Sequence, residues 1–415
     1  MSRTAFEDWF GVTPDPGDHG FDPRRLHRIT EHFDREVTAG RLPGWSAVVA
    51  RHGTAVYAGG GGLRDLRNGL PVEPETRWRM FSMTKPVTSV AAMTLVERGL
   101  LALDDPVERF VPEFAAARVY TGGPAGGMRH RSATEPIRIW HLLTHTAGLT
   151  LGFAFRDPVD ARYREIGQAL LPGPGATLRQ ACADLAGVPL LFDPGTAWNY
   201  SASVDVLGRV LEVVTGRPFD ELVTAAILEP LAMSGTGFQL AGELRPQLAE
   251  IYRVDPGSGE LTVDEQLREA ILVPAAFPSG GGGPGLVSTL GDYHRFATML
   301  AARGVLGAAR VLAPRTVDLM ARNHLPGGAD LAHAGRYPEP THRGHGFGLG
   351  VAMVLDPVAA HSTGSVGEYG WSGAANTHFF VDPVTSVTAV FCTQVVGPLE
   401  VRDQLRTLVY QAFLG

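Results

Sequence analysis

Ser82 and Lys85 are the residues whose types and spacing first suggest chemistry. They lie in the stretch FSMTKP at residues 81–86, and Lys85 is the only lysine in the chain. A serine hydroxyl is a poor nucleophile until a base removes its proton, and a residue three positions along a helix lies on the same face. The spacing is therefore compatible with a serine nucleophile and an amine base, although a lone lysine can also follow a serine in this way by chance.

Local structure around this pair gives a second interpretation, in which Ser82 only caps a helix. Residues 83–99 contain good helix formers and close with Gly99, so the sequence predicts a helix that begins just after Ser82. A capping box would place Glu or Gln at the third position, whereas Lys85 puts a cation at the positive end of the helix dipole. An amine can give up and accept a proton, but a guanidinium cannot. The lysine is an argument for catalysis, but on this motif alone both interpretations stay open.

Five stretches resemble the serine β-lactamase and penicillin-binding protein superfamily, and within it the class C β-lactamases and family VIII carboxylesterases. They are FSMTK (81–85), HLLTHTAGL (141–149), PGTAWNYSASVDVLGRVLEVVTG (194–216), GGGPGLVSTLGDYHRFATML (281–300) and GEYGWSGAANTHFFVDP (367–383). The stretches occur in the family's order and spread over most of the chain. Together they are far more specific than a single S-x-x-K motif.

The resemblance implies roles for residues outside the first motif. Tyr200 matches the family's second motif and would act with Lys85 as general base and then general acid. The triplet Trp371-Ser372-Gly373 stands at the third motif and would bind substrate. By the same carry-over, the backbone N–H groups of Ser82 and Ala374 would form the oxyanion hole, and Trp371 would line the pocket.

Two departures from the lactam-binding members bear on the substrate. Trp371 replaces the lysine or histidine of the third motif, which removes a cation that could hold a carboxylate. Ala202 stands where those enzymes usually carry an asparagine for the substrate amide. Both changes weaken a β-lactamase interpretation, and an apolar indole favours neutral acyl or alcohol groups. Simple carboxylic esters are the expected substrates.

Other motifs in the sequence are better explained by structural roles. Residues 370–374 approach the G-x-S-x-G elbow, but that motif needs a helix directly after the serine, and the sequence after Ala374 predicts a strand. His141 and His145 have a spacing that zinc ligands use, yet the glutamate of H-E-x-x-H is missing, so packing or capping is expected. His342 and His345 are expected to be loop residues. The glycine run 279–285 lacks the Lys-Ser/Thr pair of a phosphate-binding loop.

The elements that must position these residues begin and end the chain. A helix is predicted from Asp22-Pro23 to about Gly40, followed by a hairpin of strands 45–50 and 54–59. Further β-rich runs occupy 347–355, 377–382 and 386–396, with a helical tail after Pro398. We expect the two ends of the chain to share one antiparallel sheet.

The elements predict an α/β (α+β) protein with an antiparallel sheet flanked by helices, and the resemblance implies that its fold is of the serine β-lactamase/transpeptidase type. Residues 1–97 and 279–415 would form a discontinuous sheet domain, and residues 98–278 a mostly helical inserted domain. The active site would lie between them.

Composition narrows the function classes. The net charge of −7 and the absence of a basic stripe argue against nucleic acid as a partner. The amino-terminal residues lack the apolar core of a secretory signal, and no run reaches the length of a membrane span, so a cytoplasmic protein is expected. Cys182 and Cys392 lie far apart in apolar surroundings and are expected to be buried free thiols.

The expected function is cleavage of carboxylic esters through a covalent intermediate on Ser82, with no metal or organic cofactor. Three alternatives stay open at this point. An acyltransferase on the same scaffold would differ only in whether an alcohol or amine outcompetes water. A β-lactamase or D-amino-acid peptidase is opposed by Trp371 and Ala202, and a catalytically silent scaffold by the intact Ser82, Lys85 and Tyr200. The oligomeric state is not predicted.

Overall fold

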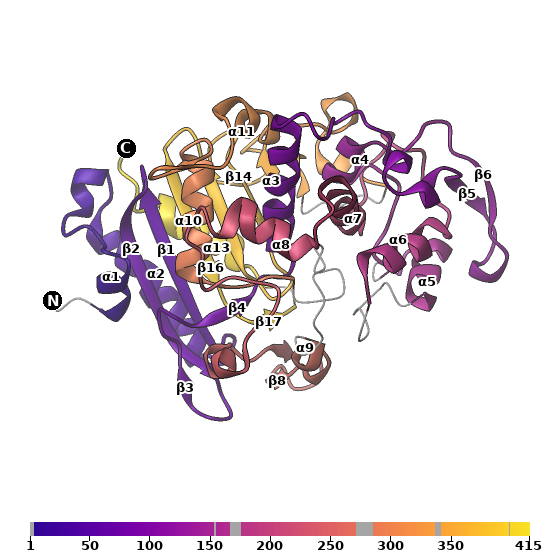
Figure 1. The fold of residues 1–415 in the computed structure, drawn as a ribbon. Helices are drawn as coiled ribbons and strands as arrows, with labels where there is room; N and C mark the ends of the chain where they lie inside the picture. Colours follow the sequence, from indigo (N-terminus) through magenta and orange to yellow (C-terminus); the bar gives the residue numbers. More distant parts are fainter. Residues whose placement is uncertain (1–3, 153–154, 167–175, 271–284, 337–341, 398) are drawn as a thin grey trace.

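A large antiparallel sheet joins the two ends of the chain (Figure 1). The computed structural model describes residues 4–415 except 153–154, 167–175, 271–284, 337–341 and 398. Strand β1 pairs with β16, from Ser46 opposite Cys392 to Arg51 opposite Val387, which confirms the predicted shared sheet. In the described part of the chain the strand order is β12 (His345–Phe347), β13 (Ala352–Val354), β14 (Tyr369–Ser372), β15 (His378–Asp382), β16 (Val387–Cys392), β1 (Gly44–Arg51), β2 (Thr54–Asp65), β3 (Leu70–Pro71).

The predicted hairpin at the amino-terminal end is the β1–β2 pair. Its two linking residues, His52 and Gly53, both have positive φ angles, 50° and 80°. Two consecutive residues in this region are typical of the tight turns whose twist matches that of antiparallel strands. Local sequence chemistry therefore sets the pairing of the two longest strands next to the turn, and a bulge between Val49 and Ala50 shifts the register beyond it.

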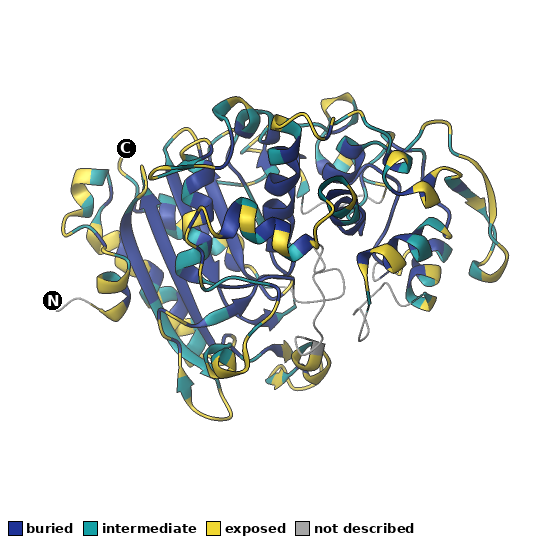
Figure 2. Cartoon of the chain, viewed as in Figure 1, coloured by how far each residue is buried: buried dark blue, intermediate teal, exposed yellow. Residues whose placement is uncertain are grey.

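Helices cover both faces of the sheet, and the alternation of strand residues separates two apolar layers (Figure 2). Ala47 and Val49 face a layer shared with α2 (Pro23–Thr38) and α13 (Val401–Tyr410), whereas Val48 faces the layer of α3 and α10. The capped α2 and the tail helix α13 were both predicted. Thr289 caps α10 (Leu290–Ala301) by accepting from the Asp292 N–H. The glycine run before it lies outside the described residues, apart from Gly285.

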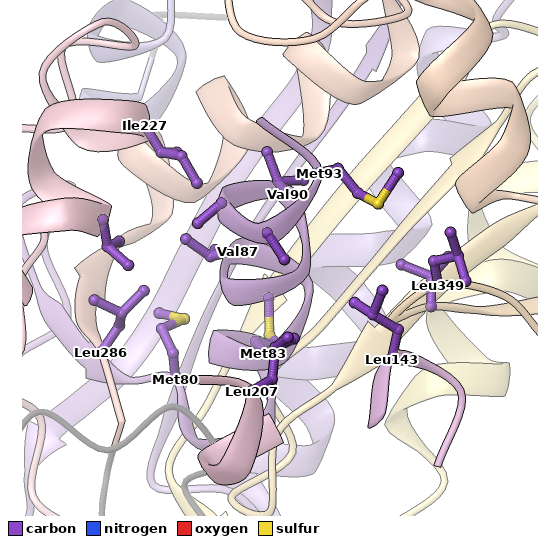
Figure 3. Packing of buried hydrophobic residues seen from close by; sticks show 14 of the residues in the cluster. Met80, Met83, Val87, Val90, Met93, Leu143, Leu207, Ile227, Leu286 and Leu349 are labelled. Carbon is purple, nitrogen blue, oxygen red and sulfur yellow. The ribbon is translucent and has the colours of Figure 1, made fainter. Parts of the chain in front are cut away.

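Helix α3 (Thr84–Glu97) is buried from Thr84 to Met93 on every side. A helix buried on every side lies in the interior of the protein, and here the buried residues include the polar Thr84, Lys85, Thr88 and Ser89 besides apolar ones. Figure 3 shows side chains from several segments converging on it. The labelled residues are Met80, Met83, Val87, Val90, Met93, Leu143, Leu207, Ile227, Leu286 and Leu349.

Helices from the middle of the chain also pack against α3. Helix α7 packs against α3, α4 and α6. In Figure 1 the hairpin β5–β6 lies at the right-hand edge of the molecule, away from the large sheet. The described helices of this part are α4 (Ile139–Leu143), α5 (Pro158–Glu165), α6 (Leu178–Ala186), α7 (Ser203–Thr215), α8 (Phe219–Val223) and α9 (Glu265–Ala270). Its strands are β5 (Arg118–Gly122), β6 (Arg129–Ser132), β7 (Tyr252–Val254) and β8 (Leu261–Val263). None of the helices in the described residues is long and apolar enough to cross a bilayer.

Two carboxy-terminal runs divide into separate strands. The run 347–355 contains the end of β12, a turn and β13. The turn includes Gly350, which has a φ of 95°, and a Cβ at this position would lie 2.1 Å from the Ser89 Oγ atom. The run 386–396 also divides. Its last residues form β17 (Val395–Val396), which leaves the large sheet and pairs in parallel with β7. His345, expected in a loop, is the first residue of β12.

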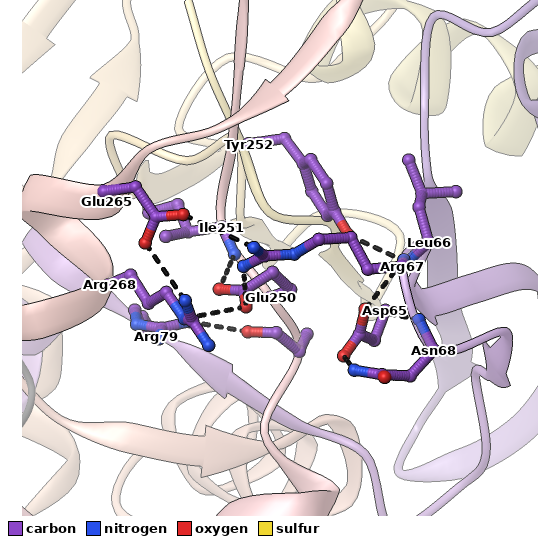
Figure 4. Close-up of polar contacts among 11 residues, drawn as sticks. Asp65, Leu66, Arg67, Asn68, Arg79, Glu250, Ile251, Tyr252, Glu265 and Arg268 are labelled. Carbon is purple, nitrogen blue, oxygen red and sulfur yellow. Dashed lines mark hydrogen bonds and ion pairs between the residues drawn. The ribbon is translucent and has the colours of Figure 1, made fainter.

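A polar network ties the sheet to the chain before α9 (Figure 4). Glu250 accepts from Arg268 at 3.0 Å and from Arg67 at 3.4 Å, and so joins α9 to the β2–β3 turn. The side chain of Arg79, in β4 (Arg77–Arg79), is buried and donates to the Ala249 carbonyl at 2.5 Å. Burial lowers the pKa of Arg79 to about 10, so the side chain stays charged at neutral pH. β4 leads directly into the segment that carries Ser82.

Candidate active site

Ser82 lies in a single 3₁₀ turn, Phe81–Met83, that leads into α3. Two contacts from a distant segment hold this turn in place. The Met80 N–H donates to the Leu286 carbonyl at 2.8 Å, and the Tyr293 hydroxyl donates to the Met83 carbonyl at 2.8 Å. Ser82 itself is half-buried, so its hydroxyl is fixed by a buried framework while remaining accessible.

Phe81, immediately before Ser82, has a φ of 47°. A bulky residue in the left-handed region costs about 1–3 kcal/mol and persists only where its surroundings enforce it. Here the side chain is 3% exposed and packs with Ile251 and Ala375. Such strain clusters at functional sites, because it turns a neighbouring side chain toward a particular direction.

Lys85 is 1% exposed and follows Ser82 on the buried face of α3. Its Nζ atom donates to the Ser82 Oγ atom at 3.1 Å. The same Nζ atom lies 4.7 Å from the centroid of the Tyr200 ring. The fold therefore brings Tyr200, more than 100 residues later in the sequence, to the Ser82–Lys85 pair.

Tyr200 stands just before α7 in a group of aromatic rings. Its ring centroid is 4.8 Å from that of His145 and 5.4 Å from that of Trp371. The Trp371 Nε1–H donates to the Tyr200 hydroxyl oxygen at 3.4 Å. These contacts restrict the ring, so that the hydroxyl is held at the cavity that Ser82 also lines.

The histidine pair in HLLTHTAGL has packing and capping roles, as predicted. The His141 Nδ1 atom accepts from the Arg138 N–H at 2.9 Å at the start of α4. His145 lies past the helix with a φ of 57°, and its Nδ1 atom is 3.1 Å from the Ser201 Oγ atom. Burial, and then the charge of Lys85, hold the pKa of His145 well below its usual range. A neutral imidazole therefore stands beside the Lys85–Tyr200 pair.

Strand β14 brings the third motif to the site. β13 pairs only with Tyr369 and Gly370 within the described residues, which leaves the strand edge open from Trp371 to Ala374. A Cβ at Gly373 would lie 2.2 Å from the Thr377 Oγ1 atom and 2.5 Å from the Met80 carbonyl oxygen. Only glycine therefore allows the strand to approach the nucleophile's turn so closely.

Ser372, the serine of the near-match to G-x-S-x-G, has a different environment from Ser82. Its Oγ atom is 2.8 Å from the His378 Nδ1 atom, and strand β15 follows it, as predicted, in place of a helix. The nucleophile-elbow interpretation therefore lacks the element that it requires.

Ser82 and Ala374, whose backbone N–H groups the resemblance assigns to the oxyanion hole, both line one cavity. Among the described residues, neither the Ser82 N–H nor the Ala374 N–H donates a hydrogen bond, whereas the neighbouring Gly373 N–H donates to the Thr377 carbonyl at 2.8 Å. Ser82 is half-buried and Ala374 is exposed. These two donors are available to a substrate oxygen.

A cavity of about 490 Å³ collects the predicted residues. Its lining includes Ser82, Tyr200 and the whole run Trp371–Ala374, and Lys85 lies buried behind Ser82.

Sequence reasoning missed Arg402 and Arg156 in this lining and gave His342, which also lines the cavity, no part in the site. Phe155 is 73% exposed, and the Arg164 guanidinium lies 4.2 Å from its ring centroid.

Comparison with known proteins gives matches along nearly the whole chain. The family model described as Beta-lactamase matches residues 29–413. Esterase EstB of Burkholderia gladioli is 32% identical over 92% of this chain and 94% of its own length. Monacolin J acid methylbutanoyltransferase of Aspergillus terreus is 28% identical over 92% of this chain and 94% of its own length. The solved structure of EstCE1, described as a hydrolase with promiscuous acyltransferase activity, has a TM-score of 0.76 at 30% identity and covers 94% of this chain and 99% of its own.

Proposed function

The chain belongs to the beta-lactamase family, and we propose that it is a serine hydrolase that cleaves carboxylic esters, as family VIII carboxylesterases do. The observation that carries the proposal is the 3.1 Å contact between the Lys85 Nζ and Ser82 Oγ atoms beside Tyr200. The similarity to EstB and EstCE1 supports the same reaction class.

In the acylation step, the Ser82 Oγ atom attacks the ester carbonyl carbon while its proton passes to the Lys85–Tyr200 pair. The carbonyl oxygen becomes an oxyanion, and the N–H groups of Ser82 and Ala374 donate to it. Preorganised donors of this kind account for much of the rate enhancement in acyl transfer. Collapse of the intermediate breaks the bond to the alcohol oxygen, which takes a proton from the Tyr200 hydroxyl. An acyl group is left on Ser82.

In the deacylation step, water attacks the acyl carbon, and the same pair removes its proton. The bond to the Ser82 Oγ atom breaks, the serine is reprotonated and the acid leaves. Lys85 and Tyr200 thus act first as base and then as acid in each half of the reaction.

The walls of the cavity favour esters over lactams. Trp371 presents an indole against Tyr200 and Phe347, where a lysine would offer a cation. Ala202 is buried, 3% exposed, at the start of α7 and has no amide to hold a lactam side chain. The apolar surfaces of Leu151, Trp198 and Trp371 in the cavity suit the acyl or alcohol part of a simple ester.

Acyl transfer to an alcohol is the second candidate function. Two relatives favour it by their described activities, a methylbutanoyltransferase and a hydrolase with promiscuous acyltransferase activity. The chemistry is the same up to the acyl-enzyme, after which an alcohol oxygen replaces that of water. The two functions therefore share every residue assigned above.

The test is turnover of a short-chain chromogenic ester and a chromogenic cephalosporin by the wild type and Ser82→Ala, with a short alcohol added in a parallel reaction. We expect ester cleavage that exceeds cephalosporin cleavage and is absent in Ser82→Ala. Formation of a new ester in the presence of alcohol would establish acyl transfer. Faster cephalosporin turnover would favour a β-lactamase, and no turnover of either substrate would favour a silent scaffold.

A further inference from the structure

Asn199 lies directly before Tyr200, and the proposed reaction gives its side chain no part. The residue is half-buried and lines the cavity that Ser82 and Tyr200 also line. An amide can both donate and accept hydrogen bonds, so what it offers a substrate depends on which of its atoms the protein already uses.

The hydrogen bonds of the Asn199 side chain fix the direction of its amide. The Nδ2 atom donates to the Leu149 carbonyl at 2.9 Å and to the Tyr200 carbonyl at 3.3 Å. Both acceptors are oxygens that would repel an amide oxygen, so the nitrogen must lie against them. The Oδ1 atom therefore points away from these two carbonyls.

The Oδ1 atom of Asn199 is free to accept. Within the described part of the chain no donor bonds to it, and the atom is not buried. Both Nδ2 hydrogens are already used, whereas an amide oxygen has two lone pairs. The group that Asn199 can offer to a substrate is therefore a neutral acceptor.

Backbone contacts hold this acceptor in place. The Asn199 N–H donates to the His145 carbonyl at 3.0 Å, and the Ala202 N–H donates to the Thr150 carbonyl at 3.1 Å. Both bonds tie the turn before α7 to residues 145–150, all of which are buried. An acceptor that is fixed before binding loses little conformational freedom when it pairs with a substrate.

A fixed acceptor distinguishes substrates by their polarity. A hydroxyl or amide N–H group that faces the Asn199 Oδ1 atom replaces the bond to water that each of them loses on binding. A methyl group at the same place would leave the oxygen without a donor, and an ether oxygen would repel it.

We propose that the substrate carries a hydroxyl or amide N–H group close to the scissile ester bond, and that this group donates to the Asn199 Oδ1 atom. The proposal rests on the proposed ester-cleaving function of Ser82. The place close to the ester bond follows from Tyr200, which adjoins Asn199 and protonates the leaving alcohol in that reaction. Separate esters distinguish a donor in the acyl half from one in the alcohol half.

The experiment compares kcat/KM within pairs of esters in which a hydroxyl replaces a methyl group. The acyl-half pair is the 4-nitrophenyl esters of 3-hydroxybutanoic and 3-methylbutanoic acid, and the alcohol-half pair is 3-hydroxyphenyl and 3-methylphenyl butyrate. Each value is divided by the rate constant for alkaline hydrolysis of the same ester, which removes differences in intrinsic reactivity. In at least one pair the wild type is expected to prefer the hydroxyl ester by about threefold to tenfold, the size of one neutral hydrogen bond. The methoxy analogue of that ester cannot donate and should not share the preference.

Asn199→Leu has nearly the same size without polar atoms, and it is expected to abolish the preference. If Asn199 only holds the turn at Tyr200, the variant would instead lower kcat for both esters of a pair alike and leave their ratio unchanged. Asn68→Leu is the matched control and should keep the wild-type ratio. Asn68 is exposed in the β2–β3 turn, donates from Nδ2 to Asp65 at 2.6 Å and does not line the cavity.

Three results would overturn the proposal. They are the absence of a wild-type preference in both pairs, a preference that Asn199→Leu retains, and a methoxy ester that is preferred as strongly as the hydroxyl ester. If Asn199→Leu does not fold, Asn199→Ala replaces it, and if neither folds, the wild-type comparison with the methoxy ester decides. Cleavage of none of these esters would instead contradict the ester-cleaving function itself.

Discussion

At the scale of single residues, Tyr200 contacts both an amine and aromatic rings. The Lys85 Nζ atom lies over the face of its ring, while the imidazole of His145 and the indole of Trp371 pack around it. The ring contacts position the phenol, and in the proposed mechanism the hydroxyl alone transfers the proton. Position and proton transfer can therefore be separated by removing one oxygen atom.

Tyr200→Phe is expected to lower kcat/KM for a short-chain ester by about 10²- to 10⁴-fold, the usual contribution of a general acid–base group. Thermal unfolding should change little, because the ring contacts remain. Tyr57→Phe is the control, since its hydroxyl bonds Thr30 at 2.8 Å in the other apolar layer. Activity of Tyr200→Phe within threefold of the Tyr57→Phe variant would rule out the assigned role.

Sequence alone indicated the residues that carry a motif, and it missed those that only the tertiary structure brings near. Ser82 and Lys85 are three residues apart, so helical geometry predicts their contact. Arg402 is 31 residues after Trp371 and belongs to no motif. Its one local signal is a cation in the first turn of a helix, and that signal indicates no particular partner.

At the scale of elements, the site depends on how closely the end of β14 approaches the turn before α3. The Gly373 position has no space for a Cβ, because the Thr377 side chain and the Met80 carbonyl occupy it. Met80 in turn bonds to Leu286 in the segment that leads into β9 (Val287–Thr289). The two halves of the proposed oxyanion hole, on Ser82 and Ala374, are therefore spaced by one backbone contact.

Gly373→Ala is expected to push β14 away from Ser82 and to lower kcat by about 10²-fold or more, as loss of one oxyanion donor does. Gly242→Ala provides the control, because a Cβ there meets no atom within 4 Å and the φ angle is not positive. Steady-state kinetics and circular dichroism of both variants make the comparison. A Gly373→Ala enzyme with wild-type kcat would show that this approach does not set the reaction rate.

Elements with strong local signals were predicted, and those set by tertiary contact were not. The β1–β2 hairpin, α2 and α10 each follow from turn or capping residues within a few positions. The division of 386–396 has no comparable signal, because β17 leaves the sheet to pair with β7, about 140 residues earlier in the chain.

At the scale of the whole molecule, burial of several histidines makes stability depend on pH. Burial, and then the charge of Arg138, lower the pKa of His141 to about 4, and burial holds those of His145 and His378 well below their usual range. Below pH 6.5 the unfolded chain binds protons that the folded chain does not. The free energy of unfolding should therefore decrease as the pH falls from about 6.5 toward about 4.

His141→Gln is expected to make this decrease shallower by up to about 1.4 kcal/mol per pH unit, the contribution of one proton. Glutamine at the same position can accept the Arg138 N–H, so the helix start is preserved. Urea unfolding of the variant and the wild type across this pH range measures the difference. Parallel curves would mean that His141 titrates alike in both states.

The most direct test of the central claim is the intact mass of the protein, recorded during turnover of a short-chain ester and compared with that of Ser82→Ala. We predict a transient adduct with the mass of the acyl group, located on the peptide that contains Ser82 and absent in the variant. Ester cleavage without an adduct in the wild type, or an equal adduct in Ser82→Ala, would contradict covalent catalysis by Ser82.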